Sequence, residues 1–215
     1  MTQFSPSSAL LTVIVLALAP FVGVMVTSFT KLVVVLSLLR NALGLQQVPP
    51  NVVLNGLALV LSIYVMYPVG SEMAAKLQNV KDIGSSTQSM MKAADLAKEP
   101  LRDFLVKHSR PVERAFFYRT AQKALKPEQA SQLTDRDFLV IVPAFTVSEL
   151  SVAFEIGFLI FLPFLVIDLV ISNVLMAMGM MMLSPTTVSM PFKLLLFVLI
   201  DGWVKLTHGL ILTYV

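Results

Sequence analysis

Residues 138–183 read FLVIVPAFTVSELSVAFEIGFLIFLPFLVIDLVISNVLMAMGMMML. Their only charged side chains are three carboxylates, and almost every other position is apolar. If wholly helical, this segment extends about 69 Å at about 1.5 Å per residue, which is about twice the hydrocarbon core of a bilayer. The segment must therefore bend or leave the membrane, and Pro143 and Pro163 are the expected bending points.

The composition of the whole chain points to the same class of protein. Of the 215 residues, 56% are hydrophobic and only 13% are charged, and the mean hydropathy is +0.81. Soluble domains are typically about 25% charged, so we predict an all-α membrane protein. The net charge of +3 is small, and it suits an anionic leaflet better than a nucleic acid. Without cysteine, the chain has no disulfide, thiolate metal site or cysteine nucleophile.

Charge divides the chain into three segments. Between Glu72 and Asp137 lie 12 of the 16 Lys and Arg residues and 9 of the 13 Asp and Glu residues. We therefore predict N-terminal hydrophobic helices over 1–71, a polar helical segment over 72–137, and C-terminal hydrophobic helical hairpins with a Met-rich loop over 138–215. The short connecting loops carry the basic residues that mark the cytoplasmic side, which puts the polar segment outside.

Three further apolar helices are expected around the polar segment. Ala9–Thr30 has 22 residues without a charge, enough for one span, and it lacks the basic start of a cleaved signal peptide. Asn51–Ser71 follows a turn that contains Pro49 and Pro50. Phe192–Leu212 is expected to form one last hydrophobic helix.

Prolines also organise the polar segment. Pro100, Pro111 and Pro127 each precede an acidic residue by one to three positions. Proline and a nearby acid suit the first turn of a helix, where the missing N–H is harmless and the helix dipole favours negative charge. We therefore expect three short helices that begin at these prolines.

Several charges are too costly for lipid alone. In Phe192–Leu212, the apolar residues contribute about −6 kcal/mol to insertion, whereas Lys193, Asp201 and Lys205 oppose it by about +9 kcal/mol. Ion pairs between helices or subunits would resolve this, although Asp201 and Lys205 also have the i, i+4 spacing of a pair within one helix. The alternative is a proton or ion pathway through the intramembrane acids. These acids are Glu149, Glu155 and Asp168.

Methionine is concentrated near the end of the long apolar segment. Six of the twelve methionines lie between positions 176 and 190, and three of them are consecutive. Because methionine is flexible and polarizable, a ring of such side chains could close a pore and still yield to a large substrate. The alternative is that they fill irregular gaps in a helix bundle. The consecutive residues are Met180, Met181 and Met182.

The chain has no recognisable catalytic motif. HExxH, Walker, GxGxxG and GxSxG patterns are absent from the sequence. The two histidines are expected to be a solvated surface residue, His108, and a polar residue near a helix end, His208. We therefore expect no enzyme activity, no metal site and no cofactor.

Several motifs together are similar to one family of membrane proteins, and the similarity runs from about residue 10 to 205. They are TSFTK (27–31), RNALGLQQVPPN (40–51), PAFTVSEL (143–150), FLPFLVID (161–168), MGMMML (178–183) and PFKLLLFVLIDGW (191–203). This combination resembles the FliP/SctR family, the export-gate subunit of flagellar and virulence type III secretion systems. Flagellar members often carry a longer N-terminal extension, so the sequence tilts toward the SctR-like injectisome branch.

The resemblance implies a fold, an activity and partners. Family members are described as pentamers that wind with SctS-like and SctT-like subunits into a helical, cone-shaped gate for unfolded secreted proteins. SctU-like and SctV-like proteins would complete the apparatus at the bacterial inner membrane, with much of the assembly on the periplasmic side. The competing hypothesis is a proton-coupled carrier or channel that uses intramembrane acids.

The resemblance also implies roles for individual residues. Met180, Met181 and Met182 match the methionine gasket that seals the idle gate. Lys193 matches a lysine that pairs with acids of neighbouring subunits, and Glu149 and Asp168 occupy the acidic positions. Three aromatic side chains of the polar segment either line the entrance or pack its short helices, and the packing interpretation is favoured. They are Phe104, Phe116 and Phe117.

Overall fold

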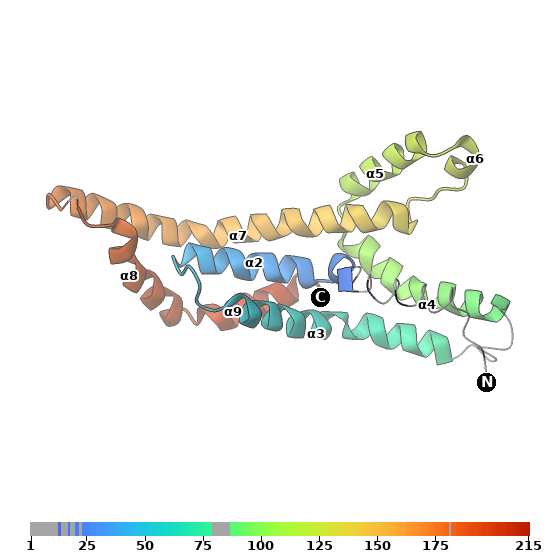
Figure 1. The fold of residues 1–215 in the computed structure, drawn as a ribbon, viewed down its shortest axis with the longest axis horizontal. Helices are drawn as coiled ribbons and strands as arrows, with labels where there is room; N and C mark the ends of the chain where they lie inside the picture. The colour runs from blue at the N-terminus through green and yellow to red at the C-terminus, as the bar shows by residue number, and fades with distance from the viewer. Residues whose placement is uncertain (1–12, 14–16, 18–19, 22, 79–86, 181) are drawn as a thin grey trace. The chain divides into compact units, whose positions relative to one another are not determined.

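The structure is a computed structural model that describes residues 13, 17, 20–21, 23–78, 87–180 and 182–215. Within these ranges the chain is helical and has no strand (Figure 1). Of the predicted membrane helix Ala9–Thr30, ten residues lie outside the described ones, and the described part is not one helix, because a turn at residues 26–28 precedes α2. The helices are α2 (Phe29–Ala42), α3 (Asn51–Gln78), α4 (Thr87–His108), α5 (Pro111–Ala124), α6 (Pro127–Ala130), α7 (Phe138–Ala177), α8 (Pro185–Leu199) and α9 (Gly202–Leu212).

The chain forms two compact units, each built from two separate stretches. Unit 1 comprises residues 1–30 and 72–147, and unit 2 comprises residues 31–71 and 148–215. Both α3 and α7 continue from one unit into the other without a break. The predicted division of the chain by polarity into three segments is a separate statement about composition, and it stays a prediction.

Helix α7 is a single helix of 40 residues, about 60 Å long (Figure 1). Pro143 and Pro163, the expected bending points, both lie inside this continuous helix, so neither ends it, and a bend at these positions stays a prediction. Each proline removes one backbone hydrogen bond. Unwinding the helix in apolar surroundings would expose several backbone groups at once, so the continuous helix is the less costly arrangement.

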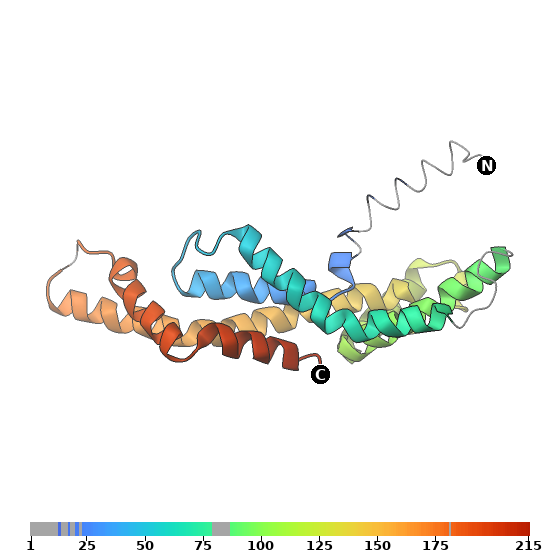
Figure 2. The same ribbon diagram turned by 90° about the horizontal axis from the view of Figure 1, so that it is seen from below.

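Unit 2 is built around the contact between α2 and α7, which lie side by side in both views (Figures 1 and 2). A buried cluster joins the end of α2 to α7 and α8. It consists of Leu39, Ala42 and Leu43, the last just beyond α2, with Phe164 of α7 and Phe197 of α8. The helices also approach closely about two turns before Phe164 on α7, where a Cβ added to Gly157 would lie 3.1 Å from the Cβ of Leu38. The absence of a side chain at Gly157 therefore allows the two helices to touch.

The last hydrophobic segment is two helices rather than the one helix predicted over 192–212. Helix α8 ends at Leu199, α9 begins at Gly202, and the two are bent by 61°. Asp201 lies at the break with a φ of 51°, the left-handed conformation that aspartate tolerates better than most residues. We call residues 199–205 the elbow.

Unit 1 contains α4, α5, α6 and the first turns of α7. Pro111 and Pro127 occupy the first positions of α5 and α6, which confirms two of the predicted helix starts. The third prediction is wrong, since Pro100 lies inside α4, and this helix already begins at Thr87. The N–H that Pro100 lacks costs α4 only one internal bond.

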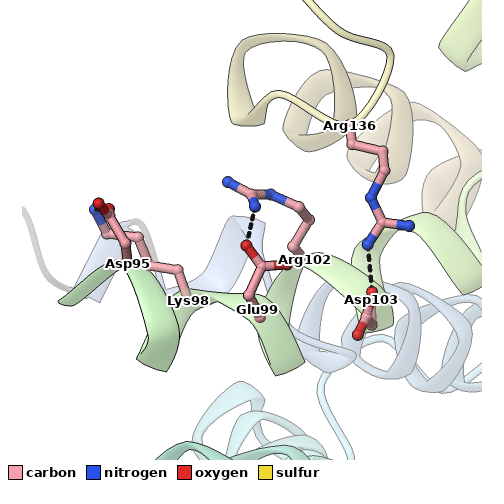
Figure 3. Close-up of polar contacts among 6 residues, drawn as sticks. All are labelled: Asp95, Lys98, Glu99, Arg102, Asp103 and Arg136. Atoms are coloured by element: carbon pink, nitrogen blue, oxygen red, sulfur yellow. Dashed lines mark hydrogen bonds and ion pairs between the residues drawn. The ribbon is translucent and has the colours of Figure 1, made fainter. Parts of the chain in front are cut away.

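Charged pairs follow one another along α4 (Figure 3). Glu99 pairs with Arg102 one turn later, and Asp103 pairs with Arg136 from the segment that leads into α7. The guanidinium group of Arg102 also lies 5.0 Å from the ring centroid of Phe138, the first residue of α7. These contacts fix the start of α7 against α4.

Two helices of the described chain, α3 and α7, are long and apolar enough to cross a membrane, and the bent pair α8 and α9 is a possible third span. The most apolar stretch of α7 is only 11% buried inside the chain, and that of α3 only 17%. Most of this apolar surface is therefore left for lipid or for other protein chains.

Candidate functional site

The first ion pair of unit 2 joins Lys31, near the start of α2, to Glu149 of α7. Nζ of Lys31 lies 3.3 Å from Oε1 of Glu149, and the two side chains are 3% and 2% exposed. Charges buried to this degree are costly unless paired. The pair is therefore a strong constraint on how α2 and α7 meet.

Tyr214, two residues beyond the end of α9, completes this cluster. Its hydroxyl donates a hydrogen bond to Oε2 of Glu149, and its ring centroid lies 3.6 Å from Nζ of Lys31. Burial raises the pKa of Tyr214, and the adjacent Glu149 raises it further, so the hydroxyl keeps its proton and acts as a donor. One tyrosine thus contacts both members of the ion pair.

A second ion pair joins α7 to α8. Nζ of Lys193 lies 2.6 Å from Oδ2 of Asp168 and also donates to the backbone carbonyl of Ala42, 3.2 Å away. Ala42 is the last residue of α2, where carbonyl groups lack a partner within the helix. The hydroxyl of Ser189 donates to Oδ1 of Asp168. Lys193 therefore ties three helices together.

The structure brings together some of the predicted charged residues. It also places Lys31 and Tyr214 in the site, and the sequence analysis had selected neither of them. Lys193 and Asp168 meet within one chain, whereas Glu149 pairs with Lys31, which was not among the candidates. Lys31 could have been noticed as the first charge after a long uncharged stretch, but nothing marked Tyr214. Pairing of these residues between subunits stays a prediction.

The methionine loop, residues 178–184, connects α7 to α8. Gly179 has a φ of 72° and ends α7, with the N–H of Met180 bonded to the carbonyl of Leu175 and the N–H of Gly179 bonded to that of Met176. This is the Schellman arrangement of a helix C-terminus. Met180 is 42% exposed and Met182 is fully exposed. Met181 lies outside the described residues.

The three phenylalanines of the polar segment have different surroundings. Phe104 is buried in unit 1, with its ring centroid 5.7 Å from that of Phe145 and 4.6 Å from that of His108. Phe116 is exposed on α5 and meets the ring of Phe117 edge to face at 5.2 Å. The aromatic groups of the polar segment are therefore not gathered at one place.

The histidines do not mark a chemical site. His108, expected to be a solvated surface residue, is half-buried beside the ring of Phe104. His208 is exposed on α9. Across the residues that the structure describes, no three His, Asp or Glu side chains are arranged to hold a metal ion.

These features define a class of protein: a helical membrane protein whose apolar helices are joined by one buried and one partly buried ion pair, and whose longest helix ends in an exposed methionine loop. The chain belongs to the FliP family, whose model matches residues 10–210. Two similar proteins are named for secretion or translocation. The hypersensitivity response secretion protein HrcR of Ralstonia nicotianae is 52% identical over 97% of both chains. The Yop proteins translocation protein R of Yersinia pestis is 53% identical over 93% of this chain and 92% of its own.

The flagellar branch is also represented among the similar proteins. The flagellar biosynthetic protein FliP of Bacillus subtilis is 44% identical over 95% of this chain and 90% of its own. The higher identity to the two secretion and translocation proteins places the chain among the SctR-like members of type III secretion. The prediction from sequence motifs is thereby confirmed at the level of the family.

Proposed function

We propose that this protein is a core subunit of a type III secretion export gate, in which identical copies form a ring that conducts unfolded proteins across the bacterial inner membrane. The observation that carries the proposal is the similarity to secretion and translocation proteins over more than nine-tenths of both chains. The family model spans residues 10–210, which contain the positions of both ion pairs, the methionine loop and the elbow.

The unburied apolar surface supports assembly into a ring. On α3 the buried side chains are Leu54, Ala58 and Ser62, which form one narrow face with a spacing of four residues. The other faces of α3 and most of α7 are apolar and exposed in the isolated chain. Neighbouring copies and partner subunits would cover part of this surface, and lipid would cover the rest.

The methionine loop is the proposed seal of the gate. Met180 and Met182 extend from a loop whose start is fixed by the Schellman turn at Gly179, so their positions are set while their side chains stay flexible. Thioether side chains lack charge and bind ions poorly. A ring of them, completed by Met181, would exclude small ions and still deform around a passing polypeptide.

Replacement of Met180, Met181 and Met182 by alanine tests the seal. We expect the oligomer to form normally and the cells to become permeable to small solutes, because alanine cannot reach across the passage. The matched control is Met176→Ala, which truncates an exposed methionine within α7 rather than in the loop. Unchanged solute leakage in the triple variant, at normal protein level, would contradict the gasket role.

The proposed partners follow from the same family relationship. SctS-like and SctT-like subunits would join the ring, and SctU-like and SctV-like proteins would stand beside it. The polar segment 72–137 would face the periplasm. Native mass spectrometry of the detergent-extracted protein with co-purifying chains tests this, since a homo-oligomer with those partners is expected and a lone protomer would contradict the gate.

The proton-coupled carrier is disfavoured by the surroundings of its acids. Glu149 and Asp168 are each engaged by a lysine inside the chain, and Glu155 also has an interaction within the chain. A relay group needs room to exchange a proton with a neighbouring group, whereas these carboxylates are already held in ion pairs. Proton flux through vesicles that contain this purified subunit alone would favour the carrier instead.

A further inference from the structure

The charged side chains of unit 2 are few, and most of them have partners inside the chain. Two ion pairs account for four of these residues. The guanidinium of Arg40 donates to Asn51 and to the carbonyl of Pro49, and Glu155 also has an interaction within the chain. The full set is Lys31, Arg40, Glu149, Glu155, Asp168, Lys193, Asp201 and Lys205.

The two remaining charges, Asp201 and Lys205, have opposite signs and lie on the same elbow. In a straight helix, their i, i+4 spacing would bring them together. Here Asp201 has left-handed backbone geometry and stands just before α9, whereas Lys205 lies inside it. Over the described residues the two side chains form no ion pair with each other or with a third group, and both are exposed.

The surroundings of the elbow are apolar on both sides. A groove of about 400 Å³ lies beside Lys205, between the side chains of Ile160, Phe164 and Leu206. A second groove of about 430 Å³ lies beside Asp201 and is bounded by Trp203 and Val204. Charged groups that project from an apolar surface of a membrane protein are costly in lipid. Protein is therefore the better cover for this surface.

We infer that the elbow is a contact surface between neighbouring copies of this chain, with Asp201 of one copy paired to Lys205 of the next. The charge balance favours a second copy as the occupant. Each chain supplies one unsatisfied anion and one unsatisfied cation at the same place, so identical copies arranged head to tail satisfy every charge. A heterologous contact of this kind closes into a ring when the rotation between successive copies divides a full turn.

This inference rests on the proposed ring of identical copies and adds the surface through which they meet. Both charges therefore serve assembly between chains, whereas the two ion pairs inside each chain serve its fold. A contact of opposite charges also excludes the wrong register, since like charges that face each other are repelled.

Charge variants with native mass spectrometry test the elbow in the full-length protein. Lys205→Glu would place two carboxylates opposite each other, and we expect it to lower the oligomer fraction by at least about tenfold. Asp201→Asn with Lys205→Glu removes the repulsion, and asparagine tolerates the left-handed backbone, so the oligomer should return. The control is Lys123→Glu, at an exposed position of α5 in unit 1.

Crosslinking then identifies the partner, and the absence of cysteine from the natural chain removes any background. Differently tagged copies that carry Asp201→Cys or Lys205→Cys are co-expressed and treated with a short bis-maleimide. We expect the mixed-tag product to exceed either single-variant product. A normal oligomer from Lys205→Glu, or no mixed product in an intact oligomer, would overturn the elbow contact and leave the ring standing. A wild-type protein that is monomeric would overturn both.

Discussion

Replacement of Glu149 by glutamine provides the sharpest test of the buried cluster. The change leaves the ammonium group of Lys31, whose side chain is only 3% exposed, without its counter-charge. Loss of one partner from a buried pair costs about 3–5 kcal/mol of folding free energy. Tyr214→Phe removes only the hydrogen bond to Glu149, and the expected loss is about 1.5–3 kcal/mol because the acceptor is charged.

A double-mutant cycle separates the pair from its surroundings. Glu149→Gln with Lys31→Met removes both charges, so the double variant should be more stable than the sum of the single effects predicts, by at least about 2 kcal/mol. The matched control is the exposed pair of Asp95 and Lys98, at 3.5 Å with side chains 77% and 53% exposed. The same cycle there should give a coupling of about 0–1 kcal/mol.

Unfolding in mixtures of SDS and mild detergent, followed by far-ultraviolet circular dichroism, supplies the free energies. A coupling between positions 31 and 149 no larger than that between positions 95 and 98 would refute the reasoning. The ion pair would then contribute little to the stability of the fold, and other groups would offset the cost of burying Lys31.

Two further predictions concern packing in unit 2. Gly157→Ala should destabilise the protein by about 1–3 kcal/mol in the same unfolding assay, because the new methyl group would press on Leu38; Gly209→Ala has open space around it and should not destabilise. Phe197→Ala should shift the emission of Trp203, the single tryptophan, to longer wavelength, since the rings meet edge to face at 5.5 Å. An unchanged spectrum would show that this contact does not shield the indole.

Much of the helical architecture follows from local sequence. Asn51 begins α3 directly after the predicted turn, and Pro111 and Pro127 begin α5 and α6. Proline was misleading at Pro100, which was expected to begin a helix and lies inside α4. A proline in a helix interior costs about 3 kcal/mol, so a proline signal alone does not decide where a helix begins.

The elbow was missed for a different reason. Hydropathy stays high on both sides of Asp201, so the segment 192–212 has the pattern of one span. The adjoining Asp201 and Gly202 both tolerate unusual backbone geometry, and a Cβ added at Gly202 would lie 2.2 Å from the ring of Phe197. That packing requirement is a tertiary property, and periodicity does not express it.

The candidate site was only partly predictable. Charges in apolar helices are conspicuous, and for this reason Glu149, Asp168 and Lys193 could be selected from sequence alone. Their partners could not be selected, because Lys31 is 118 positions from Glu149 and the pairing depends on how α2 lies against α7. Tyr214 has no charge to draw attention to it, and its role arises only from the folded geometry.

The long separation between Lys31 and Glu149 has a consequence during synthesis. Ribosomes add about 5–20 residues per second, so the 118 residues that follow Lys31, up to and including Glu149, take about 6–24 s to make. During that interval the nascent chain contains the Lys31 ammonium group, which is buried in the folded protein, but the Glu149 carboxylate that pairs with it has not yet been synthesised. Until Glu149 is made, Lys31 therefore needs a hydrated environment, such as the aqueous channel of a membrane insertase.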